Sequence, residues 1–337
     1  MKKILTIVIP TYNMQDYLRR CLDSLIVPEK QMKQLEVLVI NDGSKDNSSA
    51  IAHEYQDKYP DTFRVIDKEN GNYGSCINRG LKEASGKYIK ILDADDKFNS
   101  INFPGYIDFL LNNDSDMVLT VTDVVVEEKI INRWAFIVPE KKEIDFISYN
   151  IFPEMHCVTY RTEILKMHNY VQTEGISYTD QQWVFAPIVW MKTAIYYNVP
   201  IYEYSVGREG QTVDIQVRKK NRWMYRKVFL DILKTYNHLC FSDAKDKWLK
   251  EKMLKKLHDI FYFDLLICPD TSASLVEFDD ELKKLNILFY QESSNRIVLN
   301  KIYPIRYLRI WRKTHCKLSH RIDVRIWSFI CKIKSFL

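Results

Sequence analysis

The sequence predicts an α/β fold in which an open, mostly parallel sheet is followed by a mostly helical C-terminal region. Within the first hundred residues, short aliphatic runs alternate with segments of helical periodicity, a pattern typical of parallel strands joined by helices. Beyond Gly210 the periodicity is helical throughout. We therefore expect a sheet domain over residues 1–212 and a helical extension over residues 213–337.

The expected strands of the sheet are nearly continuous apolar runs, which suit strands that are covered on both faces. Between them, apolar side chains recur at helical spacing near residues 17–25, 46–59 and 76–86. The four runs are Ile4–Ile9, Leu35–Ile40, Phe63–Ile66 and Tyr88–Leu92.

The next hundred residues mix both periodicities. Met117–Val126 predicts a long strand, and Gln181–Met191 predicts one helix. Ala194–Asn198 and Ile201–Val206 predict a pair of strands on either side of Pro200. Long helices are expected in the extension near residues 213–240, 244–268 and 279–291.

Composition and spacing exclude several classes of protein. None of the seven cysteines forms a CxxC pair, which argues against a disulfide framework or a zinc site and fits a reducing compartment. The apolar run near the start stops at Pro10 and is shorter than the core of a secretory signal peptide. No run reaches the ~18 apolar residues of a membrane-spanning helix. These observations predict a cytoplasmic location.

Polar residues follow three of the expected strands. In an open parallel sheet the ligand crevice lies beyond the carboxyl ends of the strands, so these segments are expected to converge on one edge. Each segment alone is also typical of an ordinary turn, whereas three of them at strand ends favour a binding site. The segments are Pro10-Thr11-Tyr12-Asn13, Asn41-Asp42-Gly43-Ser44 and Asp93-Ala94-Asp95-Asp96.

The Asp93–Asp96 segment predicts a metal site. Three carboxylates within four residues repel one another unless a cation or buried donors compensate. Hard oxygen ligands of this kind suit Mg²⁺ or Mn²⁺, which in proteins commonly bridges to the phosphates of a substrate. The alternative is a solvated acidic turn.

Taken together, four segments resemble the family 2 glycosyltransferases, which have the GT-A fold, a Rossmann-like nucleotide-binding sheet. The resemblance covers roughly residues 1–211, and the ordered combination is far more specific than any single motif. The segments are PTYN (10–13), VINDGS (39–44), GNYGSCINRG (71–80) and ILDADD (91–96).

The resemblance implies a role for each matching residue. Pro10, Thr11, Tyr12 and Asn13 would line the nucleobase and ribose pocket. Asp42 would hydrogen-bond the base, usually uracil. The residues that would lie beside the nucleotide and its metal are Asn78, Arg79, Asp93, Ala94 and Asp95, with Asp96 as the additional acid that often follows the DxD motif.

The family also places an acid at the start of a helix some eighty to ninety residues past the DxD motif. Asp180 lies 85 residues past Asp95 and opens an apolar helical pattern, so the resemblance implies that Asp180 is the catalytic base. Thr179 stands where the family usually has Glu, and Asp180 is also a suitable helix cap. Arg208, in the segment GREGQ, resembles the flexible loop that covers the donor diphosphate.

The implied activity is inverting transfer of one sugar from a nucleotide-sugar, UDP-sugar by the resemblance, to a saccharide or lipid-linked acceptor in bacterial surface polysaccharide synthesis. An acceptor hydroxyl needs a carboxylate to take its proton, and the leaving diphosphate needs a cation. Two alternatives stay open. A nucleotidyltransferase also uses paired Asp residues, although Pro10–Asn13 lacks the glycine-rich basic loop expected of one. A nucleotide-sugar-binding protein without turnover would accommodate Thr179.

Charge is concentrated at the C-terminus. Residues 300–337 hold ten Lys or Arg and one acid, a net charge of +9, whereas the whole chain is +5. A basic amphipathic pattern over residues 321–337, preceded by Tyr303, Tyr307 and Trp311, predicts a helix that lies on an anionic membrane. Docking of that helix on the body of the chain is the alternative, and nucleic-acid binding is not expected. The protein would then be peripheral on the inner face of the cell membrane.

Overall fold

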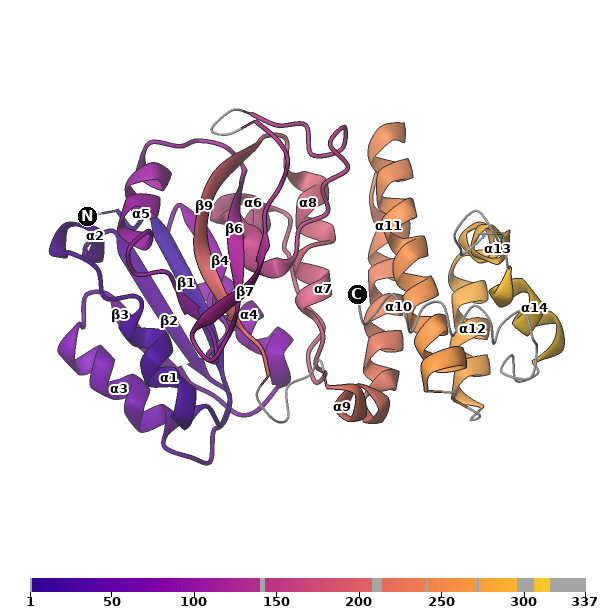
Figure 1. Cartoon of the computed structure of the whole chain (residues 1–337), viewed down its shortest axis with the longest axis horizontal. Helices are drawn as coiled ribbons and strands as arrows, with labels where there is room; N and C mark the ends of the chain where they lie inside the picture. The colour runs from indigo at the N-terminus through magenta and orange to yellow at the C-terminus, as the bar shows by residue number, and fades with distance from the viewer. Residues whose placement is uncertain are drawn as a thin grey trace. The chain divides into compact units, whose positions relative to one another are not determined.

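The computed structural model divides the chain into two compact units, Met1–Gln211 and Thr212–Leu337. It describes residues 2–139, 143–207, 214–240, 242–268, 270, 273–295 and 306–315. The division falls one residue before the boundary that the sequence predicts. Below, the two parts are called the first unit and the helical unit (Figure 1).

The first unit contains one mixed sheet of nine strands among its described residues, in the order β3-β2-β1-β4-β8-β6-β9-β5, with β7 paired to β6. The four predicted N-terminal strands, β1 to β4, run parallel to one another. Strand β8 is antiparallel to both of its neighbours, β4 and β6. The strands are β1 (Leu5–Thr11), β2 (Leu35–Asn41), β3 (Phe63–Asp67), β4 (Tyr88–Ile91), β5 (Lys97–Phe98), β6 (Met117–Val126), β7 (Lys129–Trp134), β8 (Val158–Arg161) and β9 (Ala194–Ser205).

Helices pack against this sheet, and Gly80 allows α4 to approach β1 closely. A Cβ at Gly80 of α4 would come within 2.4 Å of Val8 of β1, so only glycine fits there. The helices are α1 (Gln15–Asp23), α2 (Glu29–Met32), α3 (Ser48–Lys58), α4 (Asn72–Glu83), α5 (Phe103–Leu111), η1 (Met155–Cys157), α6 (Thr162–Met167), α7 (Asp180–Trp183) and α8 (Ala186–Trp190). The nearly continuous apolar runs of β1 and β2 are buried, as strands between two layers require.

Two predicted elements differ from the structure. The single helix expected over Gln181–Met191 is two short helices, α7 and α8, because Pro187 falls in the first turn of α8, where a missing N–H is tolerated. The two strands expected around Pro200 are one strand, β9, which pairs in parallel with β6. The register shifts next to Val121, the partner of Pro200, so the irregularity accommodates a residue that cannot donate a hydrogen bond.

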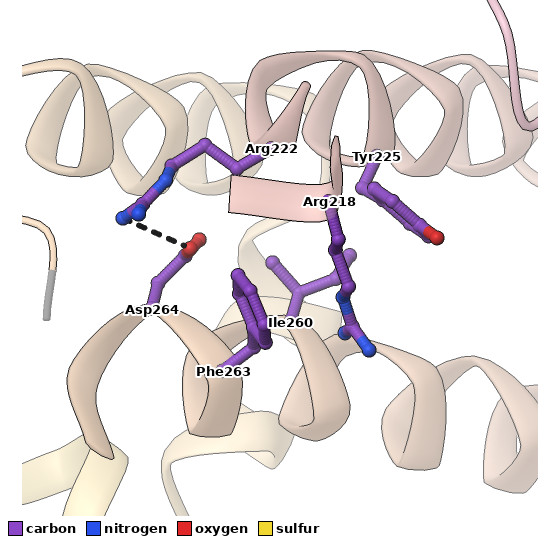
Figure 2. Close-up of a pocket in the computed structure, with 6 residues that line it drawn as sticks. All are labelled: Arg218, Arg222, Tyr225, Ile260, Phe263 and Asp264. Carbon is purple, nitrogen blue, oxygen red and sulfur yellow. Dashed lines mark ion pairs between the residues drawn. The ribbon is translucent and has the colours of Figure 1, made fainter. Parts of the chain in front are cut away.

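The helical unit consists of helices among its described residues, as the sequence predicted. They are α9 (Ile215–Lys220), α10 (Arg222–His238), α11 (Asp243–Tyr262), the π-helical turn η2 (Phe263–Ile267), α12 (Ser274–Leu285), α13 (Ile287–Asn295) and α14 (Tyr307–Thr314). Figure 2 shows a small hollow in this unit that is lined by Arg218, Arg222, Tyr225, Ile260, Phe263 and Asp264. The Arg218 guanidinium lies 4.2 Å from the centroid of the Phe263 ring, and Arg222 pairs with Asp264 at 3.5 Å.

Helix α14 corrects the interpretation of the C-terminal aromatics. The sequence pattern predicts that Tyr307 and Trp311 face a membrane, but both are buried in the helical unit. The Tyr307 hydroxyl donates to the carbonyl oxygen of His258 at 2.8 Å, and Arg312 forms a bidentate ion pair with Asp279. Burying each such aromatic side chain contributes roughly 1.5–3 kcal/mol, so residues 306–315 belong to the core of this unit. The amphipathic pattern over residues 321–337 lies outside the described residues.

None of the helices that the structure describes is both long enough and apolar enough to cross a membrane.

Candidate functional site

The ends of β1 and β2 are joined by hydrogen bonds between their loops. The two strands pair in register, with Thr11 beside Asn41, so their carboxyl ends meet at one edge. The backbone N–H of Asn13 donates to the Ser44 hydroxyl at 3.1 Å, and the Asn13 side chain accepts from the backbone of Lys45 at 2.8 Å. Asn13 has a φ of 53°, a left-handed conformation that Asn tolerates better than most residues. Thr11 is buried, Pro10 is half-buried and Tyr12 is 46% exposed.

Asp42 is held in place by a lysine that lies outside the sequence motifs. Its carboxylate is buried and accepts from Lys68 Nζ at 2.5 Å and from the backbone N–H of Gly71 at 2.9 Å. Gly43, the next residue, has a φ of +73°, which turns the chain after β2 at no steric cost. The carboxylate is therefore oriented before any ligand arrives.

Asn78 and Arg79, on α4, make contacts within the protein. The Asn78 amide donates to the carbonyl oxygen of Gln172 at 2.9 Å and accepts from its backbone N–H at 2.8 Å, which tethers the segment before α7. Arg79 is half-exposed and pairs with Glu83 one turn along the helix at 3.0 Å. In this structure both residues support α4 and its neighbours.

The acidic segment after β4 is contacted by side chains from α1 and α4. Tyr73, at the start of α4, donates its hydroxyl to Asp93 at 2.8 Å. Arg20 of α1 donates to the carbonyl oxygen of Asp95 at 2.7 Å. Ala94 between them is buried in the core. The carboxylates of Asp93, Asp95 and Asp96 are called the acid cluster below.

Asp96 is the buried member of the acid cluster, at 1% exposure. It accepts from the Tyr202 hydroxyl and from the backbone N–H of Ser205, both at 2.7 Å. Burial, together with the charges of Asp95 and Asp93, raises the pKa of Asp96 well above its usual value. Burial and the same three acids also raise the pKa of the Cys21 thiol. The site thus concentrates negative charge, which favours a cation.

His156, in η1, lies next to the acid cluster. One ligand atom from each of Asp93, Asp96 and His156 lies within 4.8 Å of the other two. The Nδ1 atom of His156 is buried and has no hydrogen-bond partner among the described residues. Burial and the nearby charge of Lys90 lower the pKa of His156 to about 3, so the ring is neutral at pH 7, the form that binds metals. Carboxylate oxygens and an orphaned neutral imidazole fit a divalent cation.

Lys90 of β4 fixes the position of η1. Its side chain is fully buried, and Nζ donates to the carbonyl oxygen of His156 at 2.6 Å and to that of Val158 at 3.2 Å. Burial lowers the pKa of Lys90 to about 7. A lysine inside an apolar strand is unusual, so Lys90 is the signal in the sequence that could have pointed to this part of the site, although no motif includes it.

Asp180 begins α7, as the sequence predicted, and is half-buried. Gln181 donates to its carboxylate at 2.9 Å. Burial and the charges of Asp93 and Asp180 together raise the pKa of the Tyr73 hydroxyl, so both acids lie within electrostatic reach of one side chain. Helix α7 also packs against η1, the turn that carries His156, so Asp180 begins a helix that lies beside the acid cluster. Arg208 lies outside the described residues.

Residues 6–167 match the family model described as Glycosyl transferase family 2. Among known proteins, the chain is 40% identical over 104 residues to a glycosyltransferase of Mycoplasma genitalium, an alignment that covers 30% of this chain and 35% of that protein. The chain thus spans about a third of that relative's length.

Two solved structures resemble this fold over most of the chain. TarS of S. aureus, residues 1–349 in complex with UDP-GlcNAc, superposes with a TM-score of 0.64 at 18% identity, covering 85% of this chain and 82% of TarS. A mannosyltransferase of Pyrobaculum calidifontis, in complex with GDP-Man and Mn²⁺, gives a TM-score of 0.54 at 15% identity, covering 87% and 84%. The predicted GT-A sheet followed by a helical C-terminal region is confirmed.

Proposed function

We propose that this chain, which belongs to glycosyl transferase family 2 through residues 6–167, moves one sugar from a UDP-sugar to a hydroxyl of a saccharide or lipid-linked acceptor, with inversion. The observation that carries the proposal is the acid cluster at the edge of the sheet where β1 and β2 also end, with α7, which begins at Asp180, packed against η1 beside it. A transferase of this kind needs a nucleotide pocket, a cation and a base within one site.

The donor would bind over the ends of β1 and β2. Asp42, oriented by Lys68 and Gly71, would accept a hydrogen bond from the base, and Pro10, Thr11, Tyr12 and Asn13 would line the pocket. The UDP-GlcNAc bound to TarS, which shares this fold, supports a uridine nucleotide. Asn78 and Arg79 would contribute by holding α4, and Arg208 would cover the diphosphate.

Asp93, Asp95 and Asp96 would hold Mn²⁺ or Mg²⁺, with His156 beside them. When bound, the cation neutralises charge on the diphosphate and on the acid cluster. The Mn²⁺ in the Pyrobaculum mannosyltransferase supports this assignment. Tyr73 and Tyr202 orient the carboxylates through the hydrogen bonds that they donate.

Asp180 would take the proton of the acceptor hydroxyl. The acceptor oxygen forms a bond to the anomeric carbon while the bond from that carbon to the diphosphate oxygen breaks, and its electron pair leaves with UDP. The proton ends on Asp180. Attack from the face opposite the leaving group inverts the anomeric configuration.

Asp180→Asn tests the proposal, because it keeps the shape and a capping oxygen but removes the base. We expect UDP binding, measured by calorimetry, to be unchanged. Sugar transfer, measured through the release of UDP, should fall by roughly 10²–10⁴-fold. Glu163→Gln, at the exposed first turn of α6, is the matched control and should behave as wild type. Full activity in Asp180→Asn would place the base elsewhere. UDP-sugar binding without any turnover by the wild type would favour a binding protein of the same fold.

We also propose that residues 316–337 bring the enzyme to the inner face of the cell membrane. Because α14 is part of the core of the helical unit, the truncation that tests this proposal ends after His315. The full chain should co-sediment with anionic vesicles and the truncated chain should not, since each Lys or Arg near the surface contributes about 1 kcal/mol. Equal sedimentation of both proteins would refute the assignment.

A further inference from the structure

Strand β6 aligns three aromatic side chains beside the acid cluster. Its residue Thr122 pairs with Trp134 on β7 and with Tyr202 on β9. Two residues further along, Val124 pairs with Tyr204 of β9. Opposed residues and every second residue of a strand share a face, so Trp134, Tyr202 and Tyr204 lie on the same face of the sheet.

The ring of His156 packs among these aromatics. Ring centroids are 5.6 Å apart for Trp134 and Tyr204, 5.7 Å for Trp134 and His156, and 4.5 Å for His156 and Tyr204. Tyr202 is fully buried beneath them and binds Asp96, whereas the other three rings are partly exposed. We call Trp134, His156 and Tyr204 the aromatic platform.

The aromatic platform lies on the other side of β4 from the expected nucleotide pocket. Strand β4, which leads into the acid cluster, stands between β1 and β2 on one side and β8, β6 and β9 on the other. The nucleotide strands and the platform are therefore on opposite sides of β4. Helix α7, which begins at the proposed base Asp180, packs against η1, which carries His156 of the platform. In agreement, burial and the charges of the acid cluster and Asp180 raise the pKa of Tyr204.

Strand β7 is largely exposed to solvent. Five of its six residues are exposed, and Trp134 is the one whose side chain turns to other rings. A partly exposed ring group beside a concentration of carboxylates combines apolar faces with hydrogen-bond acceptors. That is the composition of a site for a neutral ligand with both apolar and hydroxyl surfaces.

We propose that the aromatic platform stacks against a pyranose ring of the acceptor, so that the acceptor is a ring saccharide and not a linear polyol phosphate; this rests on the proposed function. The axial C–H bonds of a pyranose present positive hydrogens to the negative face of an aromatic ring. A polyol phosphate is an open chain and presents no such face.

Saturation-transfer NMR with the full chain, UDP and the diamagnetic cation Mg²⁺ tests the inference. The probes are cellobiose, chitobiose and lactose, with ribitol 5-phosphate for comparison. We expect saturation of the ring C–H protons of at least one disaccharide and none of ribitol 5-phosphate. Trp134→Ala should weaken disaccharide binding by roughly 2- to 10-fold, the range for losing one aromatic contact, while Trp134→Phe should restore part of it.

Ile131→Ala is the matched control, because Ile131 is exposed on the same strand, β7, and lies outside the aromatic platform. It should leave all signals unchanged, and UDP saturation should be the same in every variant, which also verifies folding. No disaccharide signal in wild type that binds UDP, equal signals in Trp134→Ala, or stronger saturation of ribitol 5-phosphate would overturn the inference alone. Absence of UDP signals in wild type would overturn the proposed function and the inference with it.

Discussion

The helical unit and the acid cluster of the first unit bury charged side chains in opposite ways. In the helical unit, Arg226 is buried between Asp264 and Asp270, with N–O distances of 2.8 and 2.5 Å. Arg312 pairs with Asp279 and lies 3.7 Å from the centroid of the Tyr290 ring. Both arginines have a carboxylate partner, which offsets much of the desolvation cost.

Around the acid cluster of the first unit, like charges are gathered and the buried groups are bonded by neutral donors or acceptors. Asp96 accepts from a hydroxyl and a backbone N–H, and Lys90 donates to two carbonyl oxygens. The resulting shifts are large, with the pKa of Lys90 lowered to about 7 and that of Asp96 raised well above its usual value. Strong perturbation of this kind is typical of functional sites. Burial also raises the pKa values of Asp264 and Asp279 in the helical unit, but there the arginine partners oppose the rise.

The largest expected loss of stability comes from removing one partner of a buried ion pair in the helical unit. Arg226→Met leaves Asp264 buried without its main partner and should lower the free energy of unfolding by about 3–5 kcal/mol. Hydrogen exchange measured by mass spectrometry should show the loss of protection in α10 to α12 and not in the first unit. Replacing both residues, Arg226→Met with Asp264→Leu, should recover most of the stability. Lys227→Met is the control, because its exposed pair with Asp231 contributes only about 0.3–0.5 kcal/mol.

A smaller change in stability is expected when a cation binds to the acid cluster. Mn²⁺ with UDP, at about a hundred times the dissociation constant, should stabilise the first unit by roughly 2.7 kcal/mol. Thermal unfolding should register this as a shift that Asp95→Ala abolishes, while protection of the helical unit stays unchanged. A shift of equal size in Asp95→Ala would show that Asp95 is not needed for the cation, and the contrast between the units would lose its functional meaning.

The smallest expected change in stability comes from Asp46, an acid of the first unit whose carboxylate is hydrogen-bonded. Asp46 accepts from the backbone N–H groups of Gln15 and Ser48, both at 3.0 Å. Although burial acts in the other direction, these bonds hold the pKa of Asp46 below its usual value. Asp46→Ala should cost about 1 kcal/mol at neutral pH.

The pH dependence of that effect follows from its sign. A carboxyl whose pKa is lowered by folding stabilises the protein above its unfolded pKa of about 3.9, and the contribution disappears as pH falls through the folded value. Denaturation at neutral and acidic pH should therefore show the wild type and Asp46→Ala converging in acid. Asp57→Ala, an exposed acid of the helix that follows Asp46, should show no comparable difference at either pH.

Local signals predicted the framework of the first unit well. The apolar runs predicted β1 to β4 within two residues at each end, and Met117–Val126 was predicted with the bounds that the structure has. The residues after those strands were predicted to gather, because parallel strands end at a common edge. Of the acid cluster, only its position could be predicted, since the hydrogen bonds from Tyr73 and Tyr202 come from residues 20 and 106 positions away.

Short stretches of sequence specify which segments are strands, where the acids stand and that the C-terminal region is helical, because apolar periodicity and strand-end motifs are local properties. Which distant residues meet them depends on the folded chain. His156 reaches the acid cluster through Lys90, and Trp134 reaches His156 only through the register of β6 with β7 and β9. A shift of one residue in that register would turn Trp134 to the opposite face, and nothing within β7 alone specifies the pairing.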